Sequence, residues 1–248
     1  MGWVDSHCHL QLDDRDPTQL LSRASEVDWV VVPGVDATTS RAALDLAARF
    51  PDRVLATAGL HPHEASSWDK QEAEITELAH RGAAVGETGL DFYRNLASSD
   101  DQRRSFEGQI RLAESLGKPV IVHCRDAFAE VYEILERAGT GSRAILHCWT
   151  GGRRWTKRFL PLGCWFSFAG PIAFETGETI RLAAELIPPE RALVETDTPY
   201  LAPPPHRHKL NEPAYVAFVG EALAEVWSLP LEQVAKQTSA NAATAFDK

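Results

Sequence analysis

Trp3-Val4-Asp5-Ser6-His7-Cys8-His9-Leu10 is the stretch of sequence that decides the fold. Its aromatic and β-branched beginning predicts a β-strand over residues 3–7. In an open doubly wound sheet, the first strand usually continues into a glycine-rich phosphate loop. Here the strand continues instead into two histidines separated by one residue. The stretch therefore favours a closed barrel over an open nucleotide-binding sheet.

The rest of the chain repeats this rhythm of short apolar runs and longer amphipathic stretches. Several runs lack polar alternation, as expected of parallel strands that are covered on both faces. The eight predicted strands are 3–7, 29–33, 54–60, 84–88, 119–124, 144–148, 164–168 and 192–196. Helical patterns cover 41–50, 102–116, 176–187, 213–227 and 231–245. Eight strands with intervening helices in 248 residues predict an α/β fold, a (β/α)8 TIM barrel.

The composition is that of an ordinary globular protein, with 44% hydrophobic and 24% charged residues, and we expect a single domain over 1–248. No stretch approaches the roughly 20 apolar residues of a membrane helix, and the N-terminus lacks a secretory pattern. We therefore expect a cytoplasmic protein with no membrane association, and nothing implies a stable protein partner. The four cysteines are expected to be reduced, and the net charge of -10 argues against tight non-specific binding to duplex nucleic acid.

Side chains of the type that binds metals recur where the predicted strands end. A barrel places its active site at the C-terminal ends of its strands, so residues far apart in the chain converge there. If the first run is a strand, alternate residues share a face, and both imidazoles of the His-x-His pair point the same way. The converging residues are His7, His9, His61, His63, Glu87, His123, His147, Glu195 and Asp197.

This ligand inventory suits one or two divalent ions, with Zn, Mn, Co or Ni favoured over Ca by the imidazoles, and Mg also considered. We assign His7, His9, Glu87 and Asp197 to one ion, and Glu87, His123 and His147 to the other. Glu87 would then bridge the two ions. Coordination lowers the pKa of a bound water to near neutrality, which makes that water the expected nucleophile. Asp197 is the predicted general base, and Glu195 is predicted to orient a ligand.

At this point the sequence resembles the TatD family of metal-dependent deoxyribonucleases. The resemblance is carried by six strings in family order: Val4-Asp5-Ser6-His7-Cys8-His9-Leu10, Gly59-Leu60-His61-Pro62-His63, Gly86-Glu87-Thr88-Gly89-Leu90-Asp91, Pro119-Val120-Ile121-Val122-His123-Cys124-Arg125, His147-Cys148-Trp149-Thr150-Gly151 and Glu195-Thr196-Asp197-Thr198-Pro199-Tyr200-Leu201. It implies an amidohydrolase-type TIM barrel, a metal site and phosphodiester hydrolysis. Carried over by position, the implied metal ligands are His7, His9, Glu87, His123, His147 and Asp197. His61 is implied to contact the substrate phosphate or to support a ligand.

The sequence departs from the family pattern in the segment that leads to Asn211-Glu212-Pro213. His208 stands where glycine is frequent, and Leu210 stands where arginine is frequent. An arginine at the second position would offer a bidentate phosphate contact, so the grip on a nucleic-acid backbone differs from the family pattern. The candidate phosphate contacts that remain are Arg125, Arg153 and Arg207, although a run of cations such as 153–158 is usually a solvated helix face.

Three functions compete on this sequence. The leading hypothesis is a metal-dependent 3′-to-5′ exodeoxyribonuclease that acts on DNA ends or single strands, with DNA or another phosphodiester as its binding partner. The alternative is a metal-dependent esterase, amidase or deacylase, for example on aminoacyl-tRNA or a lactone, because the same ligands can open those bonds. A barrel that binds metal without catalysis is the third, and the full set of ligands argues against it.

Overall fold

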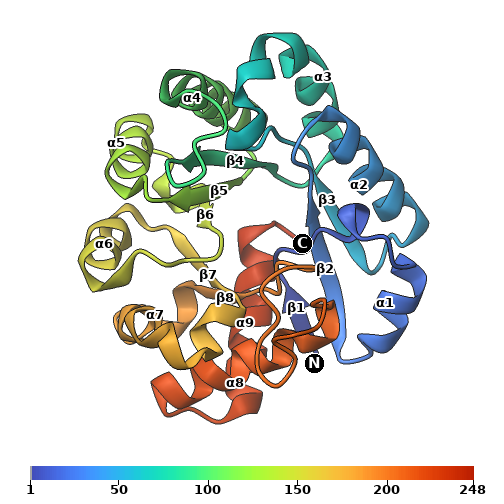
Figure 1. The fold of residues 1–248 in the computed structure, drawn as a ribbon, viewed down its shortest axis with the longest axis vertical. Coiled ribbons are helices and arrows are strands. Elements are labelled where there is room, and N and C mark those ends of the chain that lie inside the picture. Colours follow the sequence, from blue (N-terminus) through green and yellow to red (C-terminus); the bar gives the residue numbers. More distant parts are fainter. Residues whose placement is uncertain (1) are drawn as a thin grey trace.

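The computed structural model describes residues 2–248, in which parallel strands alternate with helices along the chain. The strands are β1 (Trp3–Asp5), β2 (Val27–Pro33), β3 (Val54–Thr57), β4 (Val85–Asp91), β5 (Val120–Arg125), β6 (Ala144–Leu146), β7 (Trp165–Phe168) and β8 (Ala192–Val194). The helices are α1 (Pro17–Arg23), α2 (Ala37–Arg49), α3 (Trp68–Arg81), α4 (Ser99–Leu116), α5 (Phe128–Ala138), α6 (Gly152–Phe159), α7 (Glu178–Ala184), α8 (Val216–Trp227) and α9 (Leu231–Ala245). Helices surround the strands in Figure 1.

The strands close into a ring in sequence order. Every pair from β1 to β3 and from β4 to β8 is parallel. A parallel bridge between Ala58 and Val85 joins β3 to β4. The Ser6 amide closes the ring by donating to the Val194 carbonyl at 3.0 Å. The predicted (β/α)8 barrel is therefore confirmed.

The predicted strands differ from the observed ones mainly at their C-terminal ends. β1, β6 and β8 each stop two residues before the predicted end, because the chain leaves the ladder where the polar site residues begin. β4 continues three residues further than predicted, to Asp91.

The predicted helices differ mostly at their beginnings. α2 begins at Ala37 because Asp36 accepts the Thr39 amide in a capping box. α4 likewise begins early, at Ser99, and the patterns that begin at 176 and 213 open as 3-10 turns before α7 and α8. The prediction for α9 has the observed bounds, whereas α1, α3, α5 and α6 were not delimited from the sequence.

One end of the barrel interior is apolar. Val4, Val31, Ile121, Ile145 and Leu193 form a buried cluster, and residues 242–246 at the end of α9 pack against it. A larger apolar layer lies between the strands and the surrounding helices and contains Cys8 and Cys124. All four cysteines are free thiols, as predicted.

Within residues 2–248, no single helix is both long and apolar enough to cross a membrane. The segments Pro213–Trp227 and Leu231–Ala245 meet that test only as a combined pair, which is bent by 111° at its break. The single domain over 1–248 and the cytoplasmic location stay predictions.

Candidate metal centre

The two histidines of the first motif converge, although not by strand alternation. β1 ends at Asp5, so His7 and His9 lie in the segment that follows. Backbone hydrogen bonds hold this segment: the Cys8 amide donates to Val31 O at 2.9 Å, and the His9 amide donates to Thr198 O at 2.7 Å. The two Nε2 atoms end 3.2 Å apart. Both imidazoles therefore point the same way, as expected, but backbone hydrogen bonds to neighbouring segments hold them there, not strand alternation.

Glu87 lies at the middle of the centre, on β4, and its side chain is buried. The flanking Gly86 and Gly89 each have a φ of 137°, a conformation that favours glycine. A Cβ atom at Gly89 would lie 2.0 Å from the His123 carbonyl oxygen. Glycines at these positions therefore let β4 approach β5 closely, which brings the Glu87 carboxylate to His123.

Each oxygen of the Glu87 carboxylate faces its own set of imidazoles. Oε2 lies 3.3 Å from His7 Nε2 and 3.4 Å from His9 Nε2. Oε1 lies 2.9 Å from His123 Nδ1 and 3.2 Å from His147 Nε2. The five candidate ligands thus divide into two groups that share one carboxylate.

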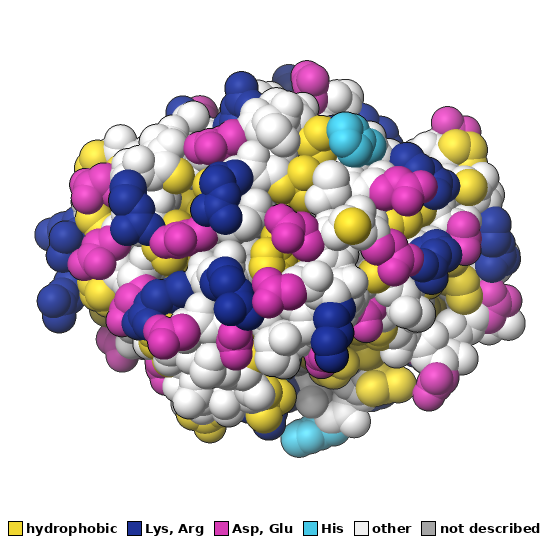
Figure 2. All heavy atoms as spheres, turned by 90° about the horizontal axis from the view of Figure 1, so that it is seen from above, with side chains coloured by type: hydrophobic (Ala, Val, Ile, Leu, Met, Phe, Trp, Pro, Cys, Tyr) yellow, Lys and Arg dark blue, Asp and Glu magenta, His cyan; other side chains and the backbone are white. Residues whose placement is uncertain are grey.

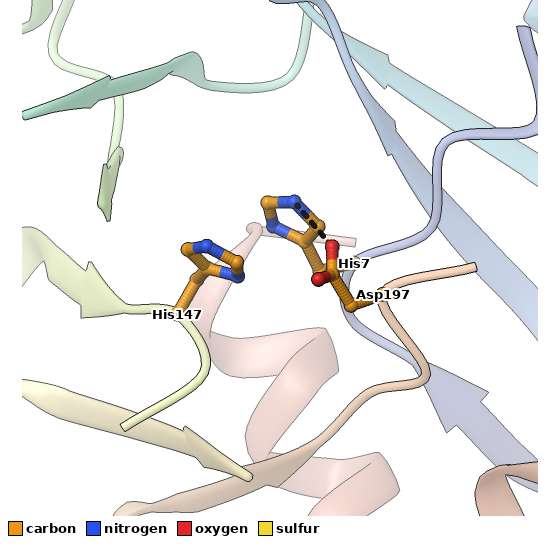
Figure 3. Close-up of side chains that lie close together, drawn as sticks. All are labelled: His7, His147 and Asp197. Carbon is orange, nitrogen blue, oxygen red and sulfur yellow. Dashed lines mark ion pairs between the residues drawn. The ribbon is translucent and has the colours of Figure 1, made fainter. Parts of the chain in front are cut away.

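Asp197 completes the group around the first motif. It follows β8 with a φ of 58°, and its amide donates to the His7 carbonyl at 2.9 Å. Its Oδ1 lies 3.8 Å from His7 Nε2 and 3.6 Å from His9 Nε2. Figure 3 shows Asp197 beside His7, with the His147 ring stacked on the His7 ring at 3.9 Å between centroids. The possible ligand atoms of these three residues lie within 4.8 Å of one another.

The residues present fit divalent cations. Within residues 2–248, the carboxylates Glu87, Asp91, Glu195 and Asp197 have imidazoles, and no Lys or Arg side chain, as close partners. Donor atoms around a tetrahedral ion lie about 3.3–3.6 Å from one another, given bonds of about 2.0–2.2 Å. The corresponding distances in the cluster run from 2.9 to 3.8 Å. One nitrogen of each ring faces the Glu87 carboxylate: Nε2 of His7, His9 and His147, and Nδ1 of His123. Imidazoles and carboxylates gathered in this way are the donor set that divalent transition metals prefer.

Burial and neighbouring charges set the protonation of the centre. Burial lowers the pKa of His7 and of His61 to about 4, so both rings are neutral at pH 7. Burial alone would raise the pKa of Glu87, but the imidazoles around it, His147 first, outweigh burial and hold that pKa well below its ordinary value. Burial raises the pKa of Asp197 to about 6. Neutral imidazoles and ionised carboxylates are the states that bind metals.

Glu195 orients His147. Its Oε1 lies 3.0 Å from His147 Nδ1 and accepts the Cys148 amide at 2.9 Å. This contact to Nδ1 turns Nε2 toward Glu87. Burial opposes a charge on His147, yet Glu87 and Glu195 raise its pKa well above the ordinary value. This part of the pocket therefore favours a positive charge.

Asp91 and His63 form a supporting pair that the sequence analysis does not predict. His63 Nε2 lies 2.8 Å from Asp91 Oδ2, and His123 Nε2 lies 3.4 Å from the same oxygen. Asp91 also accepts the amides of Tyr93 and Arg94. The only available signal was that Asp91 ends the string that begins at Gly86.

Asp5 supports the loop rather than the interior of the centre. Val4 belongs to the interior apolar cluster, so its neighbour Asp5 points to the opposite side of β1. There its carboxylate accepts the Thr196 hydroxyl at 2.6 Å and the Thr196 amide at 2.9 Å. Burial raises the pKa of Asp5 to about 8. Asp5 has the same parity as His7, which predicts from strand alternation that it faces the interior. That prediction is wrong, because the alternation ends with β1 at Asp5.

His61 and the three predicted phosphate contacts lie at different distances from the centre. His61 Nε2 lies 3.4 Å from Glu87 Oε1, and these two residues form a third possible ligand group with His123. Arg125 ends β5 and places its guanidinium 4.0 Å from the Tyr93 ring centroid. Arg153 is exposed in the first turn of α6, and Arg207 lies 4.1 Å from the Phe174 ring centroid. The structure brings His61 into the cluster and does not pair the three arginines with it among the described residues, and their substrate roles stay predictions.

The chain is similar to known metal-dependent hydrolases over nearly its whole length. Residues 4–247 match the family model described as TatD related DNase. An uncharacterized metal-dependent hydrolase, YabD of Bacillus subtilis, is 35% identical over 250 residues, covering 98% of each chain. A 3'-5' ssDNA/RNA exonuclease TatD of Edwardsiella piscicida is 38% identical, covering 84% of this chain and 85% of its own. The crystal structure of YJJV, a TatD homolog from Escherichia coli K12, superposes with a TM-score of 0.88 at 26% identity, covering 99% of this chain and 98% of that one.

Proposed function

Because the chain belongs to the TatD-related DNase family and is a metal-dependent hydrolase, we propose that it removes nucleotides from the 3′ end of single-stranded DNA by hydrolysing phosphodiester bonds. Support for this polarity and substrate comes from the related protein that is named a 3'-5' ssDNA/RNA exonuclease. A cytoplasmic location is part of the proposal.

The observation that carries this proposal is the shared carboxylate of Glu87. One of its oxygens faces His7 and His9, and the other faces His123 and His147. Two cations held by these two groups would share one carboxylate and could act on the same phosphate, as in two-metal hydrolases. We propose that His7, His9 and Asp197 hold one ion, that His123 and His147 hold the other, and that Glu87 joins them. When bound, such ions lower the pKa of water and offset charge that develops on the phosphate oxygens.

The protein's own residues divide the remaining work. Glu87 and Glu195 have side chains that are only 3% and 0% exposed, whereas the Asp197 side chain is 14% exposed. Asp197 is therefore the carboxylate that water reaches, and it is placed to take the proton of the attacking water as a general base. Glu195 holds the tautomer of His147, and Asp91 holds His63 and His123.

The charge distribution favours single strands over duplexes. With a net charge of -10, the chain lacks the basic excess on which non-specific duplex binding depends. On the face shown in Figure 2, the visible Lys and Arg side chains are interspersed with Asp and Glu rather than gathered in one band. A strand end that enters the barrel mouth needs only local contacts.

Cleavage of end-labelled oligonucleotides tests this function. Chelated protein is re-loaded with Mg, Mn, Co or Zn and given single-stranded DNA that carries the label at the 3′ or the 5′ end. The expected result is stepwise, metal-dependent loss from the 3′ end, which Asp197→Asn abolishes. A panel of carboxylic esters, lactones and an aminoacyl-tRNA is run in parallel. Turnover on that panel, with none on any phosphodiester, would overturn the proposal in favour of a deacylase.

Asp126→Asn is the matched control for this experiment. Asp126 is an exposed aspartate that follows β5 with a φ of 53°, close to the 58° of Asp197. It has no part in the histidine groups found among the described residues. Its variant therefore reports what the same substitution does at a similar backbone conformation, and we expect it to keep full activity and metal content.

A further inference from the structure

Exposed apolar side chains gather around the mouth of the barrel. Seven large hydrophobic side chains are exposed among the described residues. One of them, Leu231, lies at the start of α9 and not in a loop that follows a strand. The other six lie in loops that follow β1, β4 and β8, and we call them the rim: Leu12, Tyr93, Leu96, Tyr200, Leu201 and Leu210. Exposed apolar groups that gather at a functional mouth mark a binding surface.

The two rim tyrosines belong to opposite sides of the mouth. Tyr93 follows β4 and Tyr200 follows β8, and strands four places apart in a ring of eight face each other across it. Tyr93 is 61% exposed and Tyr200 is 54% exposed. Figure 1 shows β4 and β8 on different sides of the strand ring.

Each tyrosine is tied to a different half of the metal centre. The Tyr200 ring lies 6.5 Å from the His9 ring, and the Tyr200 amide donates to Asp197 O at 2.9 Å. The Tyr93 amide donates to Asp91 Oδ1 at 3.0 Å, and the Asp91 carboxylate also supports His123. The Tyr200 ring therefore lies beside the His9 half of the centre, and the Tyr93 backbone is held by the carboxylate that contacts the His123 half.

We propose that Tyr200 and Tyr93 are stacking platforms for the two bases that flank the scissile phosphodiester. This inference rests on the proposed function and names the feature of the substrate that this chain selects: unpaired bases that can turn away from each other. Aromatic rings bind single strands in this way, and one stacked base contributes about 1–3 kcal/mol. Arg125 covers one face of Tyr93 and adds a positive charge beside it. Bases in a duplex are stacked on their neighbours and cannot occupy both platforms.

A single missing base provides the test. Metal-loaded protein is titrated with single-stranded oligonucleotides whose last links are hydrolysis-resistant phosphorothioates and that carry one abasic residue at the last or the penultimate position. We expect each abasic position to weaken binding about 5- to 150-fold, the range equivalent to the stacking energy of one base. Tyr200→Ala should weaken binding of the intact strand as much as the loss of one of these two bases does. Tyr93→Ala should weaken it as much as the loss of the other base does. Phenylalanine at either position should restore binding, because it keeps the ring.

Non-additivity separates stacking from a structural effect. If Tyr200 stacks on one base, Tyr200→Ala and the loss of that base should together cost no more than either change alone. A 2-aminopurine base at that position should be quenched by wild type and by Tyr200→Phe, and not by Tyr200→Ala. Additive losses, or coupling of both tyrosines to the same base, would overturn the proposal. Leu231→Ala, the exposed apolar position outside the rim, is the control and should bind as wild type does.

The same assay distinguishes this inference from the proposed function. Wild type that cleaves a fully abasic strand with the KM of an intact strand would retain the nuclease function and overturn the stacking platforms. Wild type that cleaves no phosphodiester would overturn the function itself.

Discussion

At the apolar end of the barrel, Ile121, Ile145 and Leu193 pack into the buried interior cluster, whereas the residues two positions later in the chain are polar. These are His123 on β5, and His147 and Glu195 directly after β6 and β8. Two residues of extended chain span about 6–7 Å, so the barrel changes from a stabilising core to a reactive centre over that distance. The two ends share strands and backbone, and they differ in the side chains that those strands carry.

The backbone differs between the two ends as well. Seven non-glycine residues have positive φ in residues 2–248, and five of them lie in loops that follow strands: Asn95, Asp126, Cys148, Asp197 and Leu201. Such conformations cost free energy in non-glycine residues, and most of all in a leucine. The residues of the interior apolar cluster show none of them. The apolar end therefore stabilises the fold, and part of this stabilisation offsets the free-energy cost of the loop conformations that hold reactive groups at the mouth.

The largest effect should come from His147→Ala at the mouth. Loss of this imidazole removes one of the side chains that face Glu87 Oε1, so we expect kcat to fall about 10³-fold while the protein stays folded. Steady-state hydrolysis of a dinucleotide, with bound metal quantified in the same sample, measures this. Turnover near that of wild type would contradict the assignment of His147 to the centre.

Ile145→Ala, on β6 two residues before His147, should lower stability and leave activity unchanged. Ile145 is 1% exposed in the apolar cluster, so its truncation leaves a cavity and should lower the free energy of unfolding by about 2–5 kcal/mol. Denaturant titration measures the loss, and kcat of the folded fraction should stay within a factor of two. A large fall in kcat without loss of stability would contradict the division of the barrel into a stabilising end and a reactive end.

Removal of metal should destabilise the mouth selectively. Ions that bind only the folded protein stabilise it by about 2.7 kcal/mol at a concentration one hundred times Kd. Thermal unfolding with Mn and with a chelator should therefore differ by several degrees in wild type and in Ile145→Ala, and much less in His147→Ala. An equal shift in all three proteins would place the bound ions elsewhere.

Two buried asparagines give the smallest and most closely matched contrast. Asn211 Nδ2 donates to Thr196 O and Tyr200 O, both at 2.7 Å, and so spans the Asp197 loop. Asn241 Nδ2 donates to Pro189 O at 2.7 Å and to Ala192 O at 2.8 Å at the other end of β8. Either alanine variant should lose about 1–3 kcal/mol of stability.

The kinetics should separate these two variants. Asn211→Ala frees the loop that carries Asp197 and Tyr200, so kcat should fall and KM should rise several-fold. Asn241→Ala should leave both constants unchanged. Matching kinetic losses in the two variants would show that the mouth has no special dependence on its own loop.

The sequence predicted the strands better than the helices. Apolar runs mark all eight strands, because parallel strands are buried on both faces. α6 was not delimited, since four of its eight residues are Arg153, Arg154, Lys157 and Arg158, a run that reads as solvated surface. The beginning of α2 depends on the Asp36 capping box, which shifts the start by four residues from the prediction.

The sequence predicts which residues form the candidate site, but not which of them contact one another. Strand ends and residue chemistry selected the six proposed ligands. The pairing of His63 with Asp91 depends on how the loop after β3 turns back, and spacing alone does not show this. The same holds for Tyr93 and Tyr200, which are distant in sequence and acquire a common role only once the barrel has closed.

We propose that Glu87 joins two cation sites that together hydrolyse phosphodiesters. Mn is titrated into chelated protein, and bound ion and cleavage of a thymidine dinucleotide are followed in the same samples. We expect saturation at two ions per chain, with hydrolysis rising as the second site fills, and loss of both in Glu87→Gln. Saturation at one ion, or two bound ions without hydrolysis of the dinucleotide, would contradict it.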